Sequence, residues 1–229
     1  MVIKMIKAVY FDLFFTLIIP AYDKENNEFS ILSLSMAEWE KYAESSSLYH
    51  ERALGLVKSE MEIINKITDS MPFAVSDAQK KEVLAARENR MKAALQNVSG
   101  DIVDTLKILK SRDIRIGLIS NADVIDSKHW EQSTLYPYFD NAVFSCYVGA
   151  LKPDRRIYEL AMHNLNVTPD ECLFVGDGGS NELYGAKMAG MKTVFTEALD
   201  VKCAEERNRI MEYADYHIRE FTKLTLLIQ

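Results

Sequence analysis

Three short apolar segments, far apart in the sequence, share one design: each is followed at once by polar residues that can carry chemistry. The segments and the residues that follow them are 8–11 with Asp12, 114–119 with Ser120 and Asn121, and 172–175 with Gly176 and Asp177. Each segment is rich in β-branched or aromatic residues, which is typical of a buried parallel strand. Because ligands of an open parallel sheet bind at the carboxyl ends of its strands, we expect these polar side chains at one edge of a sheet.

Further strand and helix patterns alternate with these three segments. Three more strands are predicted at residues 141–146, 193–195 and 216–218. Apolar spacing and capping residues predict helices at 101–112 and 155–164, a short turn after Thr168, and a helix from an N-cap at Ser180 to Gly190. This alternation predicts an α/β fold with a Rossmann-like parallel sheet.

Residues 20–97 interrupt the alternation, since they contain no convincing strand and show helical periodicity. Apolar residues recur every three or four positions at Met36, Trp39 and Tyr42, and again at Leu54, Val57, Met61, Ile64 and Ile67. Ser76 and Gln79 have the spacing of a capping box, which predicts that another helix begins there. We therefore expect a core domain of residues 1–18 plus 98–229, with an all-helical domain of residues 19–97 inserted after the first strand.

Composition narrows the possible functions. The 229 residues carry a formal net charge of −7, and nucleic-acid binding requires a basic surface, so no nucleic-acid partner is expected. Three scattered cysteines predict neither a disulfide framework nor a structural zinc site. No apolar stretch is long enough to span a bilayer, and Asp12 interrupts the apolar N-terminal run, which argues against a signal peptide. We expect a cytoplasmic protein without a membrane partner.

Four groups of residues, in this order, resemble the motifs of the haloacid dehalogenase-like (HAD) hydrolase superfamily. They are Asp12-Leu13-Phe14-Phe15-Thr16-Leu17, Ser120-Asn121, Lys152-Pro153-Asp154, and Gly176-Asp177 with Glu182. The resemblance covers nearly the whole chain, and the helical insertion lies between the first and second motifs, as in members with a helical cap. It implies a HAD-like fold and a hydrolase of a small, anionic substrate.

The resemblance implies a role for each matching residue. Asp12 is expected to be the nucleophile, which attacks phosphorus and forms an aspartyl-phosphate. Lys152 adds a positive charge beside it, Ser120 donates a hydrogen bond to a phosphoryl oxygen, and Asn121 completes the second motif. Thr16 is expected to steady the Asp12 loop.

A Mg²⁺ ion is implied in the same way. Its expected ligands are the carboxylates of Asp12 and Asp177 and the backbone carbonyl of Phe14, because Mg²⁺ prefers hard oxygen ligands. Glu182 stands where the family usually has an aspartate. Its expected role is to orient a metal-bound water or Lys152.

Phe14 departs from the phosphatase pattern, in which a second aspartate two residues after the nucleophile acts as general acid and base. Without it, a poor leaving group such as a sugar alkoxide loses about 10²–10⁴ in rate. Dehalogenases and phosphonatases of the superfamily also lack this aspartate and are alternatives, as is a non-catalytic binding protein of the same fold. The acidic pattern around Asp177 favours phosphoryl chemistry, whereas a dehalogenase needs no metal. Tyr158 resembles a dehalogenase position but fits equally well as a packed helix residue.

The helical insertion is expected to act as a cap that closes over the sheet edge and selects the substrate. Its aromatic residues either line the pocket or, more in keeping with helical spacing, form the core of the cap. They are Trp39, Tyr42 and Tyr49. The pattern predicts neither the identity of the substrate nor the oligomeric state.

Overall fold

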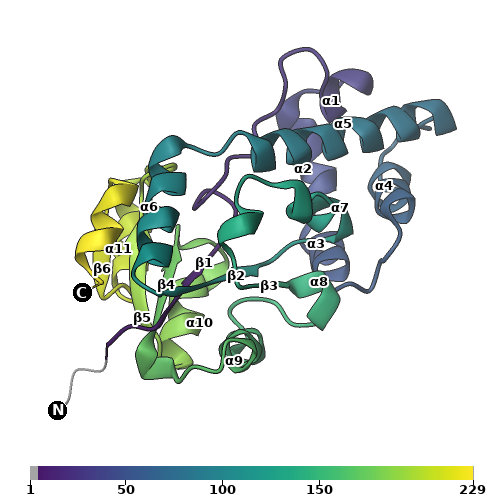
Figure 1. Ribbon diagram of the computed structural model, residues 1–229. Helices are drawn as coiled ribbons and strands as arrows, with labels where there is room; N and C mark the ends of the chain where they lie inside the picture. The colour runs from purple at the N-terminus through teal and green to yellow at the C-terminus, as the bar shows by residue number, and fades with distance from the viewer. Residues whose placement is uncertain (1–4, 229) are drawn as a thin grey trace.

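The computed structural model describes residues 5–228 and contains a six-stranded, fully parallel sheet (Figure 1). The strand order is β3-β2-β1-β4-β5-β6. The strands are β1 (Ala8–Phe11), β2 (Arg115–Ser120), β3 (Asn141–Phe144), β4 (Cys172–Gly176), β5 (Lys192–Thr196) and β6 (Tyr216–Ile218). The predicted α/β fold with a parallel sheet is therefore confirmed. Strands β1, β2 and β4, which carry the three segments with polar ends, are neighbours at the centre of the sheet.

Helices cover both faces of the sheet. The side chains of a strand alternate between the two faces, and both faces here carry apolar residues that the helices bury. Val9 and Phe11 of β1 pack with helix α6 (Gly100–Ser111) and the 3-10 segment η5 (Phe221–Leu226). Ala8 and Tyr10 face the other way and pack with helices α9 (Arg155–Asn164) and α10 (Glu182–Met188). All four side chains of β1 are fully buried, so this strand fixes the position of the residue that follows it.

Five helices between β1 and α6 form the helical segment, residues 28–96, which gathers at one side of the sheet (Figure 1). They are α1 (Glu28–Ile31), α2 (Met36–Ala43), α3 (Ser46–Ala53), α4 (Glu60–Asp69) and α5 (Asp77–Gln96). Trp39, Ile63, Ile64 and Val83 form a separate apolar core with Ile125 of helix α7 (Val124–Ser127). The predicted capping box at Ser76 and Gln79 begins α5.

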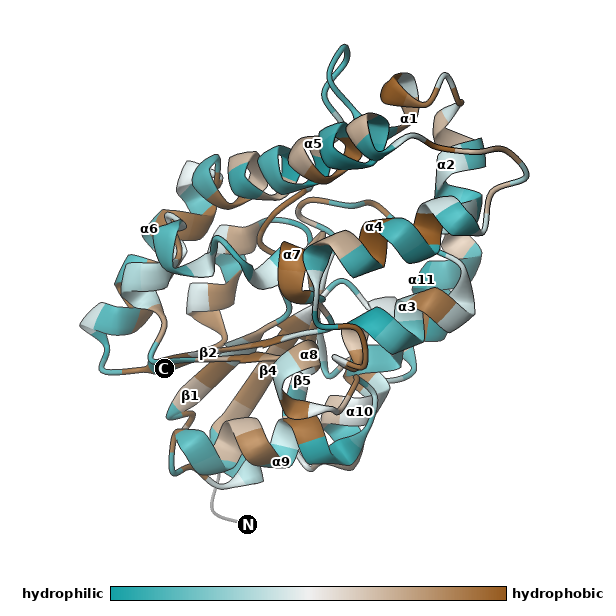
Figure 2. Ribbon diagram, turned by 90° about the vertical axis from the view of Figure 1, so that its right-hand side faces the viewer, coloured by the Kyte–Doolittle hydropathy of each residue, from teal (hydrophilic) through white to brown (hydrophobic). Residues whose placement is uncertain are grey.

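The remaining elements are short. They are α7 (Val124–Ser127), α8 (Ser145–Val148), α11 (Ala204–Met211), and the 3-10 turns η1 (Trp130–Gln132), η2 (Tyr136–Tyr138), η3 (Pro169–Glu171) and η4 (Gly179–Asn181). Hydrophobic residues concentrate on the strands, while hydrophobic and hydrophilic residues alternate along the helices (Figure 2). None of the helices within residues 5–228 is long and apolar enough to cross a membrane.

Three local predictions are wrong. The third strand ends at Phe144, and Ser145 and Cys146 begin helix α8. Leu54 and Val57 lie between helices α3 and α4, because Gly55 has a φ of 71° and its backbone approaches Cys146 so closely that a Cβ atom would lie 1.9 Å from the Cys146 carbonyl oxygen.

Ser180 is the third error, since it is not the N-cap of α10. Its φ of 52° places it in a left-handed turn, whereas an N-cap residue has extended backbone, and the helix begins at Glu182. The C-terminal end follows the prediction, because Gly190 adopts a φ of 91° just beyond the helix.

Candidate active site

Asp12 lies directly after β1, and its carboxylate is almost fully buried. The backbone amide of Asp12 donates to Val175 of β4 at 2.9 Å, which holds the residue against the neighbouring strand. The Thr16 hydroxyl donates to Asp12 Oδ2 at 3.0 Å, and Lys152 Nζ donates to Oδ1. The loop from Asp12 to Thr16 turns through Phe15, which has a φ of 59°. Both oxygens of the carboxylate are thus held in fixed positions.

Lys152 is buried between two carboxylates, since its Nζ also contacts Glu182 Oε2 at 2.6 Å. Asn121 positions the lysine: its side-chain oxygen accepts from the Lys152 amide at 2.8 Å, and its side-chain nitrogen donates to the Lys152 carbonyl at 3.2 Å. Burial alone lowers the pKa of an ammonium group, but the charges of Asp12 and Glu182 outweigh it and raise the pKa of Lys152 above its ordinary value. Lys152 therefore carries its charge at neutral pH.

Asp177 and Glu182 bring two more buried carboxylates to the same point. Asp177 Oδ1 accepts from the Gly179 amide, and Glu182 Oε1 accepts from the Gly178 amide, each at 3.0 Å. Carboxylate oxygens of Asp12, Asp177 and Glu182 lie within 4.8 Å of one another. Burial and the neighbouring charge of Asp12 raise the pKa of Glu182 well above its ordinary value.

The Glu182 side chain reaches this cluster over Gly176. A Cβ atom at position 176 would lie 2.0 Å from Glu182 Oε1, so a larger residue there would force the glutamate carboxylate to shift. Gly176 and Glu182 thus act as a pair, in which the missing side chain of one accommodates the longer side chain of the other.

The three carboxylates suit a divalent cation. They offer hard oxygen atoms close enough together to bind one ion, which is the donor set that Mg²⁺ takes in proteins. When all three carboxylates are ionised, the two lysines that contact them, Lys152 and Lys202, leave one negative charge in excess. A buried excess charge of this kind is costly unless a cation compensates it.

Lys202 was not found from the sequence. Its Nζ lies 2.5 Å from Asp177 Oδ2 and also 2.5 Å from Asp200 Oδ2. The residue belongs to the loop after β5, where nothing in the local pattern distinguishes it from an ordinary surface lysine. Only the folded sheet brings this loop beside the end of β4.

Ser120 follows the fold as predicted, at the last position of β2 and fully buried. Within residues 5–228, its hydroxyl oxygen is one of few buried side-chain polar atoms without a hydrogen-bond partner. A buried hydroxyl without a partner calls for a ligand or a water molecule to complete it.

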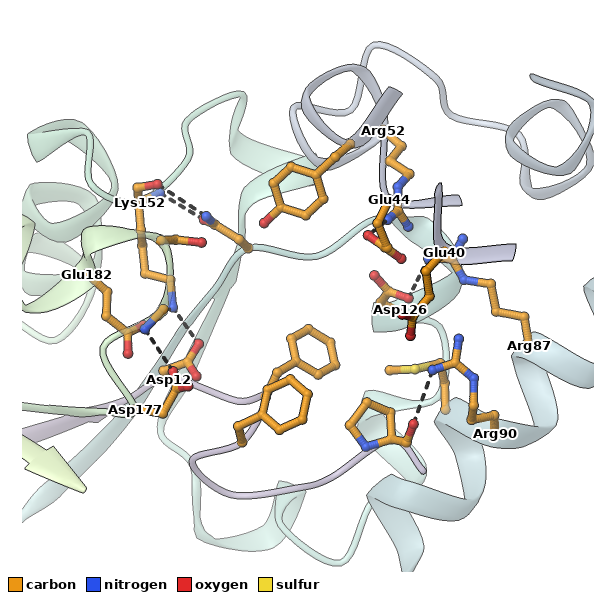
Figure 3. A pocket seen from close by; sticks show the side chains of 18 of the residues that line it. Asp12, Glu40, Glu44, Arg52, Arg87, Arg90, Asp126, Lys152, Asp177 and Glu182 are labelled. Atoms are coloured by element: carbon orange, nitrogen blue, oxygen red, sulfur yellow. Dashed lines mark hydrogen bonds and ion pairs between the residues drawn. The ribbon is translucent and has the colours of Figure 1, made fainter. Parts of the chain in front are cut away.

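A cavity of about 420 Å³ opens in front of the acidic cluster and Lys152, whereas the buried Ser120 does not line it. Asp12, Lys152, Asp177 and Glu182 lie at one end of it, and charged residues of the helical segment lie at the other (Figure 3). The remaining lining residues are Phe14, Phe15, Pro20, Tyr22, Glu40, Glu44, Tyr49, Arg52, Arg87, Arg90, Met91, Asn121, Asp126, Gly179 and Ser180.

Among the three aromatic residues considered from the sequence, only Tyr49 lines the cavity. Trp39 is 1 % exposed and belongs to the core of the helical segment, against which Tyr42 also packs. Tyr158 lies outside the cavity lining as well. It is fully buried on α9, and its hydroxyl donates to the Glu182 carbonyl at 2.8 Å. This hydrogen bond helps to fix the backbone that carries the Glu182 side chain.

The far wall of the cavity is an ion-pair network that sequence analysis did not find. Arg52 and Arg87 are each 3 % exposed, and both donate to Asp123 Oδ2 at 2.7 Å. Arg52 also pairs with Glu44 and Arg87 with Asp126. Since Asp123 precedes α7 and the arginines lie on α3 and α5, the network ties the helical segment to the sheet domain.

Comparisons with known proteins agree with the family resemblance of the sequence motifs. The family model for haloacid dehalogenase-like hydrolases matches residues 6–190. A glyceraldehyde 3-phosphate phosphatase from Pyrococcus furiosus is 35 % identical over 128 residues, which are 55 % of this chain and 52 % of that protein. A glyceraldehyde 3-phosphate phosphatase from Methanothermobacter thermautotrophicus is 33 % identical over 113 residues, or 48 % of this chain and 49 % of the relative. The chain therefore spans about half the length of these curated relatives.

Solved structures share the fold. A HAD family enzyme from Bacteroides thetaiotaomicron, in complex with magnesium and inorganic phosphate, is 19 % identical with a TM-score of 0.66, covering 87 % of this chain and 98 % of that one. An L-2-haloacid dehalogenase from Xanthobacter autotrophicus is 17 % identical with a TM-score of 0.67, covering 98 % of both chains. The match of the family model over most of the sequence shows that this chain belongs to the haloacid dehalogenase-like hydrolase family.

Proposed function

We propose that this hydrolase is a Mg²⁺-dependent phosphatase of small phosphorylated metabolites, acting through an aspartyl-phosphate at Asp12. The observation that carries the proposal is the buried cluster of Asp12, Asp177 and Glu182 around Lys152. The cavity of about 420 Å³ has the size of a small-molecule site. The relatives named glyceraldehyde 3-phosphate phosphatase support a small phosphorylated metabolite as substrate.

In the first step, a carboxylate oxygen of Asp12 forms a bond to phosphorus, and the bond from phosphorus to the leaving-group oxygen breaks. Lys152 stabilises the negative charge shared by the carboxylate and the phosphoryl oxygens. The unpartnered hydroxyl of Ser120 is available to donate to one of those oxygens. Thr16 and Asn121 act indirectly, since they hold Asp12 and Lys152 in position.

In the second step, water attacks the aspartyl-phosphate, which releases inorganic phosphate and restores the Asp12 carboxylate. Asp12, Asp177 and the carbonyl of Phe14 are the proposed ligands of Mg²⁺, with Glu182 beside them. When bound, the ion offsets the repulsion between the carboxylates and the phosphate dianion. The helical segment forms the cap that limits access of water to the cavity.

Residue 14 decides which leaving groups the site can release, because it stands where a general acid would protonate them. Phe14 lines the cavity but has no proton to donate, so the leaving oxygen must take its proton from water. The leaving groups of acyl and aryl phosphates depart with little help from a proton. The leaving oxygen of an alkyl phosphate must be protonated as its bond to phosphorus breaks. We therefore expect acetyl phosphate and p-nitrophenyl phosphate to be better substrates than sugar phosphates.

The test is phosphate release from acetyl phosphate and p-nitrophenyl phosphate with Mg²⁺, with EDTA, and with an Asp12→Asn variant. Turnover that needs the metal and falls to background in the variant supports the proposal. A parallel assay measures chloride release from 2-chloropropionate. Chloride release without metal would instead assign the protein as a dehalogenase, and a folded protein inactive on all of these compounds would contradict the phosphatase proposal.

A further inference from the structure

Lys202 is held in the loop after β5 by a built framework. Its backbone amide donates to Glu197 Oε1 at 2.9 Å, and its carbonyl accepts from Arg207 Nη2 at 2.8 Å. Glu197 is 2 % exposed and makes a two-pronged ion pair with Arg207. The backbone at position 202 is therefore held on both sides, so Lys202 can exchange ion-pair partners only through a movement of its side chain.

The Lys202 ammonium group lies between two carboxylates of different character. Asp177 has a side chain that is 7 % exposed and belongs to the acidic cluster, while Asp200 has a side chain that is 41 % exposed and lies outside it. Both are at 2.5 Å from Nζ. The ammonium thus has a second partner to remain with when it leaves the first.

We propose that Lys202 is a tethered cation that competes with a divalent metal ion for Asp177, so that metal binding shifts Lys202 onto Asp200. The proposal rests on the metal site of the proposed function. Asp177 Oδ1 accepts a neutral hydrogen bond from the Gly179 amide, whereas Oδ2 is paired with the charged Lys202, so an incoming ion meets a competing cation on this side chain. An ion that binds Oδ2 must displace Lys202 or share that oxygen with it, and an ion that binds Oδ1 still lies close to the Lys202 ammonium group, so in either case the two cations repel each other.

Lys202 consequently lowers the affinity for the metal ion. Before the ion binds, it also partly neutralises the negative charge of the site. Without the ion and with all three carboxylates ionised, Lys202 leaves one excess negative charge in the cluster instead of two, which limits the desolvation cost of the buried carboxylates. The same contact must be broken when the ion binds. Its strength therefore sets the concentration of Mg²⁺ at which the site fills.

Isothermal titration calorimetry of the whole chain with MgCl₂, without substrate, tests the proposal. Lys202→Met should tighten Mg²⁺ binding by roughly 5- to 20-fold, because a nearby like charge is removed. Asp200→Asn should act in the opposite direction and weaken binding, because Lys202 loses its second partner and stays on Asp177. Lys187→Met is the matched control, since Lys187 forms an exposed ion pair with Asp215 and should leave the affinity unchanged.

Unchanged or weaker binding in Lys202→Met overturns the proposal, and so does a wild-type protein without a Mg²⁺ signal or a signal that survives Asp177→Asn. If Lys202→Met does not fold, Asp200→Asn decides alone, and unchanged or tighter binding in that variant contradicts the competition. These measurements do not depend on turnover. A protein that binds Mg²⁺ as described but releases no phosphate would therefore disprove the proposed function while leaving this inference intact.

Discussion

Replacing Phe14 with aspartate tests the leaving-group argument most directly. Phe14 lines the cavity two residues after Asp12 and is half-buried, packing partly against the core of the sheet domain. An aspartate there would present a carboxylic acid to the leaving oxygen. The phosphate dianion of the bound substrate would lie nearby, and its charge would raise the pKa of a new carboxyl group and help it to keep its proton.

The size of the effect follows from what general acid catalysis contributes. A well-placed acid is worth about 10²–10⁴ in rate, or about 3–5 kcal/mol of barrier. Part of this will be lost to imperfect placement, so we expect a gain of roughly 10- to 1000-fold for an alkyl phosphate. Losing the half-buried ring costs about 1–2 kcal/mol of stability, which a domain of ordinary stability tolerates.

The assay compares kcat/KM for β-glycerol phosphate and for acetyl phosphate in the wild type, Phe14→Asp and Phe14→Asn. The asparagine variant has the same shape but no proton of suitable acidity, so it serves as the control. We expect the aspartate to raise the alkyl phosphate value far more than the acetyl phosphate value. Equal gains on both substrates, no gain, or the same gain in Phe14→Asn would refute the leaving-group argument.

Three further predictions concern the charged residues. Lys152→Met should lower phosphate release by roughly 10²–10³, because the nucleophile loses its counter-charge; retention of full kcat would contradict this role. Asp123→Asn should cost about 3–5 kcal/mol in urea unfolding, since two buried arginines lose their shared partner, whereas Asp154→Asn at an exposed pair should cost about 0–1 kcal/mol. Hydrogen bonds from Arg207 lower the pKa of Glu197 to about 2, so the destabilisation caused by Glu197→Gln should be full at pH 7 and shrink as the pH falls from about 4.5 towards 2; a penalty independent of pH would argue against it.

Much of the fold could be predicted from the sequence because the signals are local. A buried strand needs only a short run of apolar residues, and the polar residue that ends it marks the edge where ligands bind. For that reason the sequence alone was enough to place Asp12, Ser120, Asn121 and Asp177 at the strand ends. The roles assigned to them remain predictions until variants are measured.

The errors arise where a distant contact overrides a local pattern. The apolar spacing through Leu54 and Val57 is helical, but the close approach of Gly55 to Cys146 ends the helix before it. Ser180 is a good capping residue by type, but the left-handed turn of η4 gives it the wrong backbone. The role of Lys202 could not be predicted, because its partner Asp177 lies 25 residues away in the sequence, at the end of a different strand.

The charges of the cavity also bear on the choice between phosphatase and dehalogenase. A haloacid carries a carboxylate that needs a free cation in the pocket to bind it. Within residues 5–228, every arginine that lines the cavity is already paired with acidic side chains: Arg52, Arg87 and Arg90. The acidic cluster adds further negative charge at the reacting end. A haloacid anion would therefore meet no free arginine in the far half of the cavity and, without a metal ion, only excess negative charge at the reacting end, whereas a phosphate ester with an uncharged organic portion needs compensation only at Asp12, where a divalent cation would supply it. This asymmetry predicts that 2-chloropropionate neither reacts nor inhibits, and competitive inhibition by this anion would show that one of the arginine pairs opens to receive it.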